Sequence, residues 1–506
     1  MIASVLNGCA GHAERTRDIR TALDVAQPRR ALDLINGELE VGSARELPRE
    51  LGGDNGLLLL DRAMVLQQLG YYRLSSRDLE TADKQVEVLD LSRNAVHDLG
   101  RYLFSDEAGP YKAPAYEKLM INTMNMVNYL TRGDLNGARV EARRLAVMQK
   151  FIRDHEDPAD ALLGPGSYLA GFTFERSKQP EEALRYYDEA LRYYDESQKL
   201  TEYRTLLEPV RRLASQTGYR SPRIRKLLKP DQDDGSGTEP SEPGWKRRTV
   251  RIPAASNAAQ ESDWGTQKSS DAANADESGA GVPNKPATPA TTEKLETKPA
   301  EADATDGEIL VVVGFGRVPA KYARRIPIGL ALTYASDALS PYDSEQANYL
   351  AFQGLVSWIN YPELGAPHGE YDTPEFALDG KWQALEGVLE LDREAKRAWQ
   401  AARGAVVGSA ITRLVSRIVV GETVRQAAGK GLTGALLSLG TQATLTAFDT
   451  PDTRSWSTLP ARLALGRVRV AAGEHQVFLR ARGLYKRQRV TIAPGGWAVV
   501  TLTALM

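Results

Sequence analysis

The sequence predicts a multidomain chain of α followed by α+β class, in which an irregular α-helical array, a disordered linker and a mixed domain ending in an antiparallel β meander follow one another. Between residues 14 and 228, apolar residues recur at the spacing of about 3.6 residues that marks a helix. Residues 229–307 are rich in Pro, Ala, Ser, Thr and charged residues, a composition that buries too little apolar surface to fold. From 308 to 506, β-branched runs between turn residues predict strands mixed with helices.

The composition restricts the classes of function. Over 506 residues the formal net charge is −2, so no overall field attracts nucleic acid, which we do not expect as a partner. A single cysteine excludes an internal disulfide framework and a cysteine-rich metal site. The five histidines are dispersed along the chain, whereas a zinc site needs them clustered. We therefore expect no metal, no cofactor and no catalytic residue.

The cysteine, Cys9, lies in the N-terminal segment 1–13, directly after Leu6-Asn7-Gly8. This arrangement resembles the end of a bacterial lipoprotein signal, where lipid is attached to a cysteine at the cleavage point. The residues before Cys9 contain no basic n-region and no full apolar h-region. Either the true start lies upstream, or the resemblance is accidental and Cys9 is an ordinary free thiol. In a lipoprotein, Ala10 after the cysteine favours the outer membrane, facing the periplasm.

One helix pair stands out in segment 14–228. Gly171 and Phe174 share one predicted helix, and Ala183, Tyr187 and Ala190 share the next. Small residues allow the two helices to approach closely, while the aromatic rings fill the gap between them. The pair resembles a tetratricopeptide repeat unit, and two looser units lie earlier without a regular period. We therefore predict an irregular tetratricopeptide-like array.

The segment from 308 onwards changes to strands. Ile309–Val313 and Ile326–Leu332 are apolar runs typical of strands, and a helical pattern follows from Leu391 to about Gln426. The last fifty or so residues alternate apolar and polar side chains, which predicts a sheet with one buried face. We expect two hairpins there: RVRV with HQVFLRA, and LYKRQRVTI with WAVVTLTAL.

Basic residues concentrate in these last strands. On one face of a sheet they would attract an anionic polymer such as a glycan or lipid head groups. Alternatively, they keep the outer face soluble and the edge strands unpaired. Few aromatic residues interleave with them, which argues against base stacking. The candidate residues are Arg467, Arg469, Arg480, Arg482, Lys486, Arg487 and Arg489.

A second basic pair lies on the helix that follows Gly133. Arg143 and Arg144 are candidates for receiving an acidic peptide in the groove of the array. The alternative is structural, with Glu141 pairing with Lys118 or Arg144 on a neighbouring turn.

The stretch from Pro110 to Leu145 is the most distinctive part of the sequence. Together with Asp452–Trp456, the following Leu459-Pro460 and the Gly473–His475 turn, it resembles a family of bacterial envelope lipoproteins of undetermined function. Members of that family begin with a lipid-modified cysteine, continue with tetratricopeptide-like helices and end in a strand-rich domain. The resemblance implies the same organisation here, with Cys9 as the site of lipid attachment.

Together, these observations predict an envelope-anchored scaffold or adaptor lipoprotein that mediates protein-protein interactions in cell-envelope or wall assembly. Its expected partners are other envelope proteins, the membrane through the lipid on Cys9, and an anionic glycan. One alternative is a glycan-acting hydrolase of the periplasm that uses the acidic loop around Glu370 and Asp372. The other is a cytoplasmic tetratricopeptide adaptor without lipid.

Overall fold

The computed structural model describes residues 11–51, 54–91, 111, 113–161, 163–197, 203–228, 306–352, 358–367, 371–427 and 450–506. Cys9 and nearly all of the predicted linker 229–307 lie outside the described residues. One compact unit contains both the segment up to Thr238 and the segment from Thr305 onwards. The sequence predicts two folded halves on a long tether, whereas the structure packs the described parts of both around one hydrophobic core.

The N-terminal half is helical, and most of its helices pack as antiparallel neighbours joined by short turns. Gly70 and Gly133 have positive φ angles of 81° and 73° in two of these turns, a conformation that glycine adopts without steric cost. Asp134 caps the helix after the second turn by accepting a hydrogen bond from the Gly137 N–H. The helices are α1 His12–Arg15, α2 Arg17–Asp24, α3 Pro28–Glu38, α4 Asn55–Gln68, α5 Tyr72–Leu91, α7 Ala115–Thr131, α8 Leu135–His155, α9 Gly164–Arg176, α10 Pro180–Glu196, α11 Arg204–Gln216 and α12 Pro222–Leu228, with a 3₁₀ turn at Pro158–Ala161.

The predicted helix pair is formed by α9 and α10. A Cβ atom on Gly171 would lie 2.4 Å from the Tyr187 ring, so only glycine allows this approach of the two helices. Phe174, Ala183 and Ala190 are also buried, and the Phe174 ring stacks on Tyr186 with 5.1 Å between centroids. Close packing of α9 against α10 therefore depends on one small residue facing one large ring.

The C-terminal half contains strands in three sheets and a second set of helices. The strands are β1 Asp306–Phe315, β2 Lys321–Pro327, β3 Trp358–Leu364, β4 Glu375–Leu378, β5 Lys381–Gln383, β6 Glu386–Glu390, β7 Arg462–Ala471, β8 Gly473–Ala481, β9 Leu484–Ile492 and β10 Trp497–Ala504. The helices are α13 Ile328–Ala335, α14 Pro341–Phe352 and α15 Leu391–Ala427. We call the sheet β10-β1-β7-β6 the central sheet and the sheet β5-β4-β8-β9 the outer sheet; β2 and β3 form a separate ribbon.

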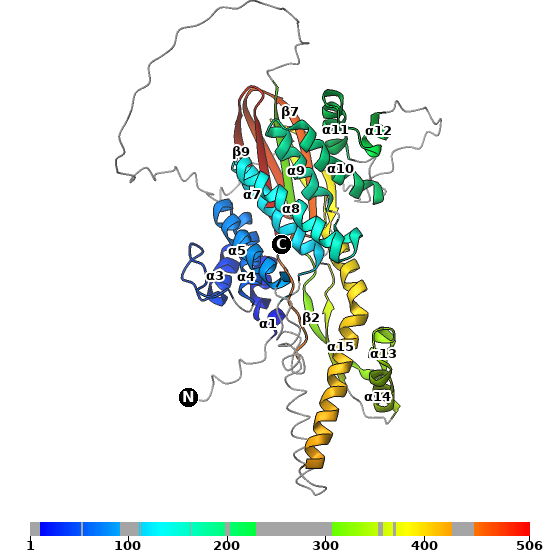
Figure 1. Ribbon diagram of the computed structural model, residues 1–506. Helices are drawn as coiled ribbons and strands as arrows, with labels where there is room; N and C mark the ends of the chain where they lie inside the picture. The colour runs from blue at the N-terminus through cyan, green and yellow to red at the C-terminus, as the bar shows by residue number, and fades with distance from the viewer. Residues whose placement is uncertain are drawn as a thin grey trace, which may run out of the picture. The chain divides into compact units, whose positions relative to one another are not determined.

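The central sheet is the middle of three layers (Figure 1). Leu310 and Val312 of β1 belong to the core shared with the helices, so the neighbouring residues, such as Val311, point to the opposite face. The outer sheet covers that face. A Cβ atom on Gly466, which pairs with Val311, would lie 3.3 Å from the Phe376 ring of β4. The helices and the outer sheet therefore enclose the central sheet from both sides.

The pairing of the last strands differs from the two predicted hairpins. β7 pairs with β1 and β6, and β10 runs parallel to β1. The hairpin that does form joins β8 to β9 through Arg482-Gly483, whose φ angles of 48° and 79° suit a tight turn. β10 is apolar along almost its whole length, as expected of a strand buried on both faces. The C-terminal region is thus strand-rich and largely antiparallel, with one parallel pair.

A small second core lies outside the three layers. The β2–β3 ribbon, α13, α14 and α15 bury a set that includes Ile326, Tyr361 and Ile411, and Figure 1 shows α13 and α14 beside α15. The predicted strand at Ile326–Leu332 is mostly helix, because β2 ends at Pro327 and α13 follows. No helix within the described residues is both long and apolar enough to cross a membrane.

The Trp456–Thr458 segment, which precedes β7, is hydrogen-bonded to the helical half. Thr458 donates from its backbone N–H and its hydroxyl to Asp61 Oδ1 of α4, at 3.1 and 2.8 Å. The Trp456 N–H donates to Glu117 of α7 at 3.2 Å, and the Trp456 ring is fully buried. Burial raises the pKa of both carboxyls, Asp61 and Glu117.

Two chains that comprise residues 1–238 and 305–506 should assemble without a covalent connection. Because both halves contribute side chains to one core, each chain alone would expose a large apolar surface. We expect a stable one-to-one complex on co-expression, measured by size-exclusion chromatography with light scattering. Two soluble, cooperatively folding monomers that elute apart would contradict the shared core.

Candidate functional site

Arg467, one of the predicted anion-binding residues, is buried between the helices and the central sheet. Its side chain is only 4% exposed. The guanidinium group contacts both oxygens of Glu175 on α9, at 2.8 and 2.9 Å, and Glu308 on β1 at 2.6 Å. The positive charge of Arg467 is therefore used inside the fold and does not face an external polymer.

Further polar groups surround this ion pair. The Tyr187 hydroxyl donates to Glu175 at 2.6 Å, and Arg176 contacts Glu308 at 3.1 Å. Burial by itself would raise the pKa of Glu175, but the guanidinium groups of Arg467, Arg176 and Arg212 outweigh burial and hold that pKa well below its usual value. The Glu175 carboxylate is consequently ionised, and the guanidinium groups compensate its charge.

Lys486 also points inward. It pairs with Leu479 across the β8–β9 hairpin, and its ammonium group donates to the Thr501 carbonyl at 3.0 Å and to the Tyr72 hydroxyl at 3.2 Å. Burial lowers the pKa of Lys486 to about 8. Arg467 and Lys486 therefore leave the predicted anion-binding set, because strand alternation places them on buried faces.

Arg480, Arg487 and Arg489 remain together on the solvent face of the outer sheet. They are exposed, and the register pairs Arg487 with Phe478 and Arg480 with Tyr485 across the hairpin. Aromatic side chains share this face, which the sequence prediction missed because Trp382 lies about a hundred residues away on β5. We call the following set the outer face: Trp382, Phe478, Arg480, Tyr485, Arg487 and Arg489.

Two aromatic residues of the outer face are exposed, and one of them contacts the half-buried Phe478. Trp382 and Tyr485 are each 58% exposed. The Trp382 and Phe478 rings meet edge to face with 6.2 Å between centroids, and the Arg487 guanidinium lies 5.7 Å from the Phe478 ring. Glu375 contacts Arg480 at 3.5 Å. Aromatic residues and arginines are residue types that are enriched in binding interfaces.

The two other predicted basic residues lie elsewhere. Arg469 is exposed on the central sheet and pairs with Glu208 of α11 at 3.1 Å. Arg482 occupies the β8–β9 turn, with its guanidinium 5.2 Å from the Tyr371 ring. Neither belongs to the outer face.

The predicted peptide site at Arg143 and Arg144 is not a free groove. Arg144 pairs with Asp83 at 2.8 Å, and the Arg143 guanidinium lies 5.8 Å from the Phe174 ring. Glu141 accepts a hydrogen bond from Asn122 at 3.1 Å instead of pairing with either predicted partner.

The sheet-facing side of these helices is occupied by the chain itself. The Phe172 ring of α9 meets the Trp497 ring of β10 edge to face at 5.9 Å. A partner protein would therefore have to contact the outward side of the helices, where the Arg143 side chain is exposed.

Acidic side chains around the predicted hydrolase loop are dispersed among different partners. Glu370 lies outside the described residues, and Asp372 is exposed. Glu375 pairs with Arg480, and Asp379 accepts from His475 at 2.7 Å. Among the residues that the structure describes, no group of His, Cys, Asp and Glu is arranged to hold a metal ion.

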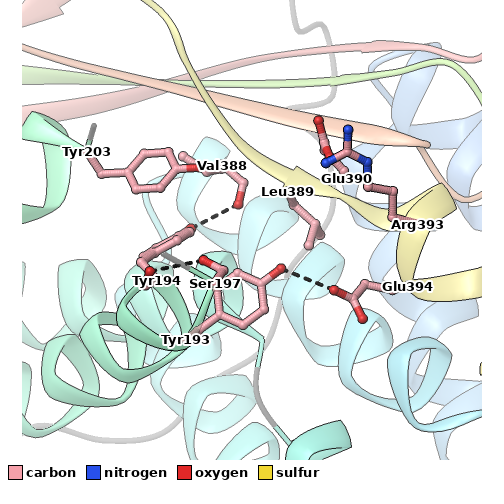
Figure 2. Close-up of a pocket in the computed structure, with 9 residues that line it drawn as sticks. All are labelled: Tyr193, Tyr194, Ser197, Tyr203, Val388, Leu389, Glu390, Arg393 and Glu394. Atoms are coloured by element: carbon pink, nitrogen blue, oxygen red, sulfur yellow. Dashed lines mark hydrogen bonds and ion pairs between the residues drawn. The ribbon is translucent and has the colours of Figure 1, made fainter. Parts of the chain in front are cut away.

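A small pocket with a volume of about 190 Å³ lies where the end of α10 and the start of α11 meet β6 and α15. Tyr193, Tyr194 and Tyr203 line it together with Glu390 and Glu394. Figure 2 shows Tyr194 directed at Val388 and Tyr193 directed at Glu394. The sequence prediction missed this pocket, although the Tyr193-Tyr194 pair at a helix end is a visible signal.

No protein-family model matches the chain, and no curated protein matches it significantly. The resemblance to envelope lipoproteins therefore stays a prediction.

Replacement of Arg467 should be far more harmful than replacement of Arg469 two residues later. Arg467→Met leaves Glu175 and Glu308 buried with only Arg176 and Arg212 as cations, so we expect a loss of about 3 kcal/mol in the free energy of unfolding. Arg469→Met, at an exposed position, should cost less than about 0.5 kcal/mol. Urea denaturation measures both, and equal losses would contradict the role of Arg467.

Glu141 should make stability depend on pH. Burial raises its pKa to about 7, so the folded state favours the protonated form. The contribution of protonated Glu141 to the free energy of unfolding is fully present below the unfolded pKa of about 4.3. It is lost as the pH rises through about 7, and the loss is on the order of 3 kcal/mol. Relative to wild type, Glu141→Gln should therefore be more stable at pH 8 and nearly equal at pH 4, as measured by urea denaturation. The exposed control Glu474→Gln should show no such change with pH.

Proposed function

We propose that the protein is an envelope-anchored adaptor lipoprotein that acts by binding and performs no catalysis, and that its outer face holds an anionic glycan. The observation that carries the proposal is the grouping of Arg480, Arg487 and Arg489 with Trp382 and Tyr485 on one solvent-exposed sheet face.

The chemistry of the outer face suits a charged sugar polymer. Guanidinium groups form bidentate hydrogen bonds with carboxylates, the usual anionic groups of such polymers. Aromatic rings present flat apolar surfaces to the C–H faces of sugar rings, and exposed Tyr and Trp contribute large contact area at low entropic cost. A sheet face also repeats along its strands, so it can contact several residues of an extended chain. These properties support polymer binding over a small-molecule site.

The helical half supplies the adaptor part of the proposal. The close approach of α9 and α10 at Gly171 supports the proposal of a tetratricopeptide-like unit, and units of this kind commonly bind proteins. Since the central sheet covers one side of the helices, the partner protein would use the outward side, which includes Arg143.

Lipid attachment at Cys9 is the remaining part of the proposal. The argument for it is the signal-like Leu6-Asn7-Gly8 that precedes the cysteine. Mass spectrometry of the protein expressed from its full upstream reading frame tests it. A mass increase confined to the N-terminal peptide is expected, whereas an unmodified thiol would favour the cytoplasmic alternative.

Loss of the outer arginines should weaken glycan binding without affecting the fold. The full chain is incubated with purified peptidoglycan, which carries peptide carboxylates, and the bound fraction is measured after sedimentation. We expect Arg480→Ser/Arg487→Ser/Arg489→Ser to bind at least about tenfold more weakly, since each charge-assisted hydrogen bond contributes roughly 1.5–3 kcal/mol. Binding by the wild type should also weaken as salt is raised.

Two comparisons make this experiment specific. Arg469→Ser removes an exposed arginine outside the outer face and should bind as wild type does. Uncharged chitin should bind only weakly to the wild type and to the triple variant. Equal binding by the triple variant would reject the outer face as the site. Release of soluble glycan fragments that depends on Asp372 would favour the hydrolase alternative.

A further inference from the structure

Three tyrosines and two glutamates line the pocket, and Arg393 is the cation among its lining residues. Tyr194 donates its hydroxyl proton to the Val388 carbonyl at 3.1 Å, and Tyr203 donates to the Gly387 carbonyl at 3.0 Å. Tyr193 is directed at the Glu394 carboxylate, with 3.5 Å between the oxygens. The hydroxyl protons are thus engaged with the protein, so these side chains offer the pocket only ring faces and oxygen lone pairs.

The three rings form a contiguous surface. The Tyr193 and Tyr194 centroids are 5.0 Å apart with the rings nearly perpendicular, and those of Tyr194 and Tyr203 are 4.3 Å apart. Perpendicular rings cannot stack together on one flat ligand, but they can surround a compact group from several directions. Such an arrangement is the one that proteins use to bind ammonium groups through the negative faces of aromatic rings.

Two carboxylates complete the pocket. Glu390 and Glu394 line it, with side chains only 15% and 25% exposed. Each already pairs with an arginine: Glu390 with Arg393, and Glu394 with Arg397 at 3.1 Å. Since Arg393 is 69% exposed, solvent screens its attraction to Glu390, and a ligand cation can compete with it for this carboxylate.

The volume limits what can enter. At about 190 Å³, the pocket is smaller than the roughly 300–1,000 Å³ that drug-sized ligands need. One compact head group fits, and the rest of a larger molecule would extend into solvent past Arg393.

We propose that this pocket binds an alkylammonium group. A primary or quaternary ammonium would lie against the tyrosine rings with its charge facing Glu394 and Glu390. The group can come from a free amine or from a lipid head group, since both present the same chemistry. This proposal is independent of glycan binding by the outer face.

Isothermal titration calorimetry with the full chain and three soluble probes tests it. Choline and ethanolamine are expected to bind, whereas acetate is expected not to. Vesicles of phosphatidylcholine, compared with vesicles of phosphatidylglycerol, then distinguish a lipid source from a free amine: binding to the former alone assigns the head group, and binding of soluble choline alone assigns the free amine. Absence of heat with both amines up to tens of millimolar would overturn the proposal.

Variants of the pocket separate a cation site from an anion site. Glu394→Gln should weaken choline binding roughly tenfold, and Tyr193→Leu roughly three- to tenfold. Arg393→Ala should tighten it about two- to fivefold, because it removes the cation that competes for Glu390. Loss of binding in Arg393→Ala, or acetate binding that depends on Arg393, would overturn the proposal.

Thermal melting of each variant controls for folding. Arg393 and Glu394 have partly exposed side chains, so their replacement should leave the melting temperature within a few degrees of wild type. The triple outer-face variant should bind choline as wild type does, which keeps failure of this proposal distinct from failure of the glycan proposal.

Discussion

Arg467 is the residue on which the arrangement of the two halves depends. Its guanidinium group contacts a helix carboxylate and a strand carboxylate at the same time, and each interaction is charged, short and buried. A buried charge without partners is costly, so the sheet has few positions relative to α9 in which all these groups are satisfied. Apolar contacts supply most of the attraction between the layers, since they are numerous but undirected. The ion pair fixes the orientation of the central sheet relative to α9.

The same constraint accounts for the second fastening point. Asp61 and Glu117 are buried helix carboxyls that receive hydrogen bonds from the Trp456–Thr458 segment. Without the strand-rich half, Asp61 would lose the hydrogen bonds from Thr458, and Glu117 would keep the hydroxyls of Tyr111 and Tyr116 but lose the Trp456 N–H. Polar residues of the helical half are thus complementary to the C-terminal half at more than one place, which favours a single cooperative unit over two domains on a tether.

Local features of the fold can be predicted from the sequence, and distant pairings cannot. Residue spacing predicts the close approach of α9 and α10 at Gly171, the start of α15 and the strand-rich C-terminal end. These features can be predicted because helix and strand periods are local. The parallel pairing of β1 with β10 joins residues nearly two hundred positions apart, and no local pattern marks it. Alternation did contain one unused signal: Lys486 and Arg487 are neighbours on a strand and must point to opposite faces.

The candidate sites show the same division. Arg480, Arg487 and Arg489 belong to a basic run that is visible in the sequence, whereas Trp382 joins them only through the pairing of β4 with β8. The tyrosine pocket requires α10 to meet β6, about two hundred residues later. The two proposed sites contrast, because the outer face carries arginines and the tyrosine-lined pocket carries two glutamates.

The distance along the chain between Glu175 and Arg467 also matters during synthesis. The two residues are 292 positions apart. At a synthesis rate of about 5–20 residues per second, Arg467 is therefore added to the chain roughly 15–60 s after Glu175. During that interval Glu175 has only Arg176 and Arg212 beside it, and the apolar face intended for the central sheet is uncovered. The nascent helical half therefore needs protection for far longer than a helix takes to form, and a chaperone that shields apolar surfaces should be most important for this protein in that interval.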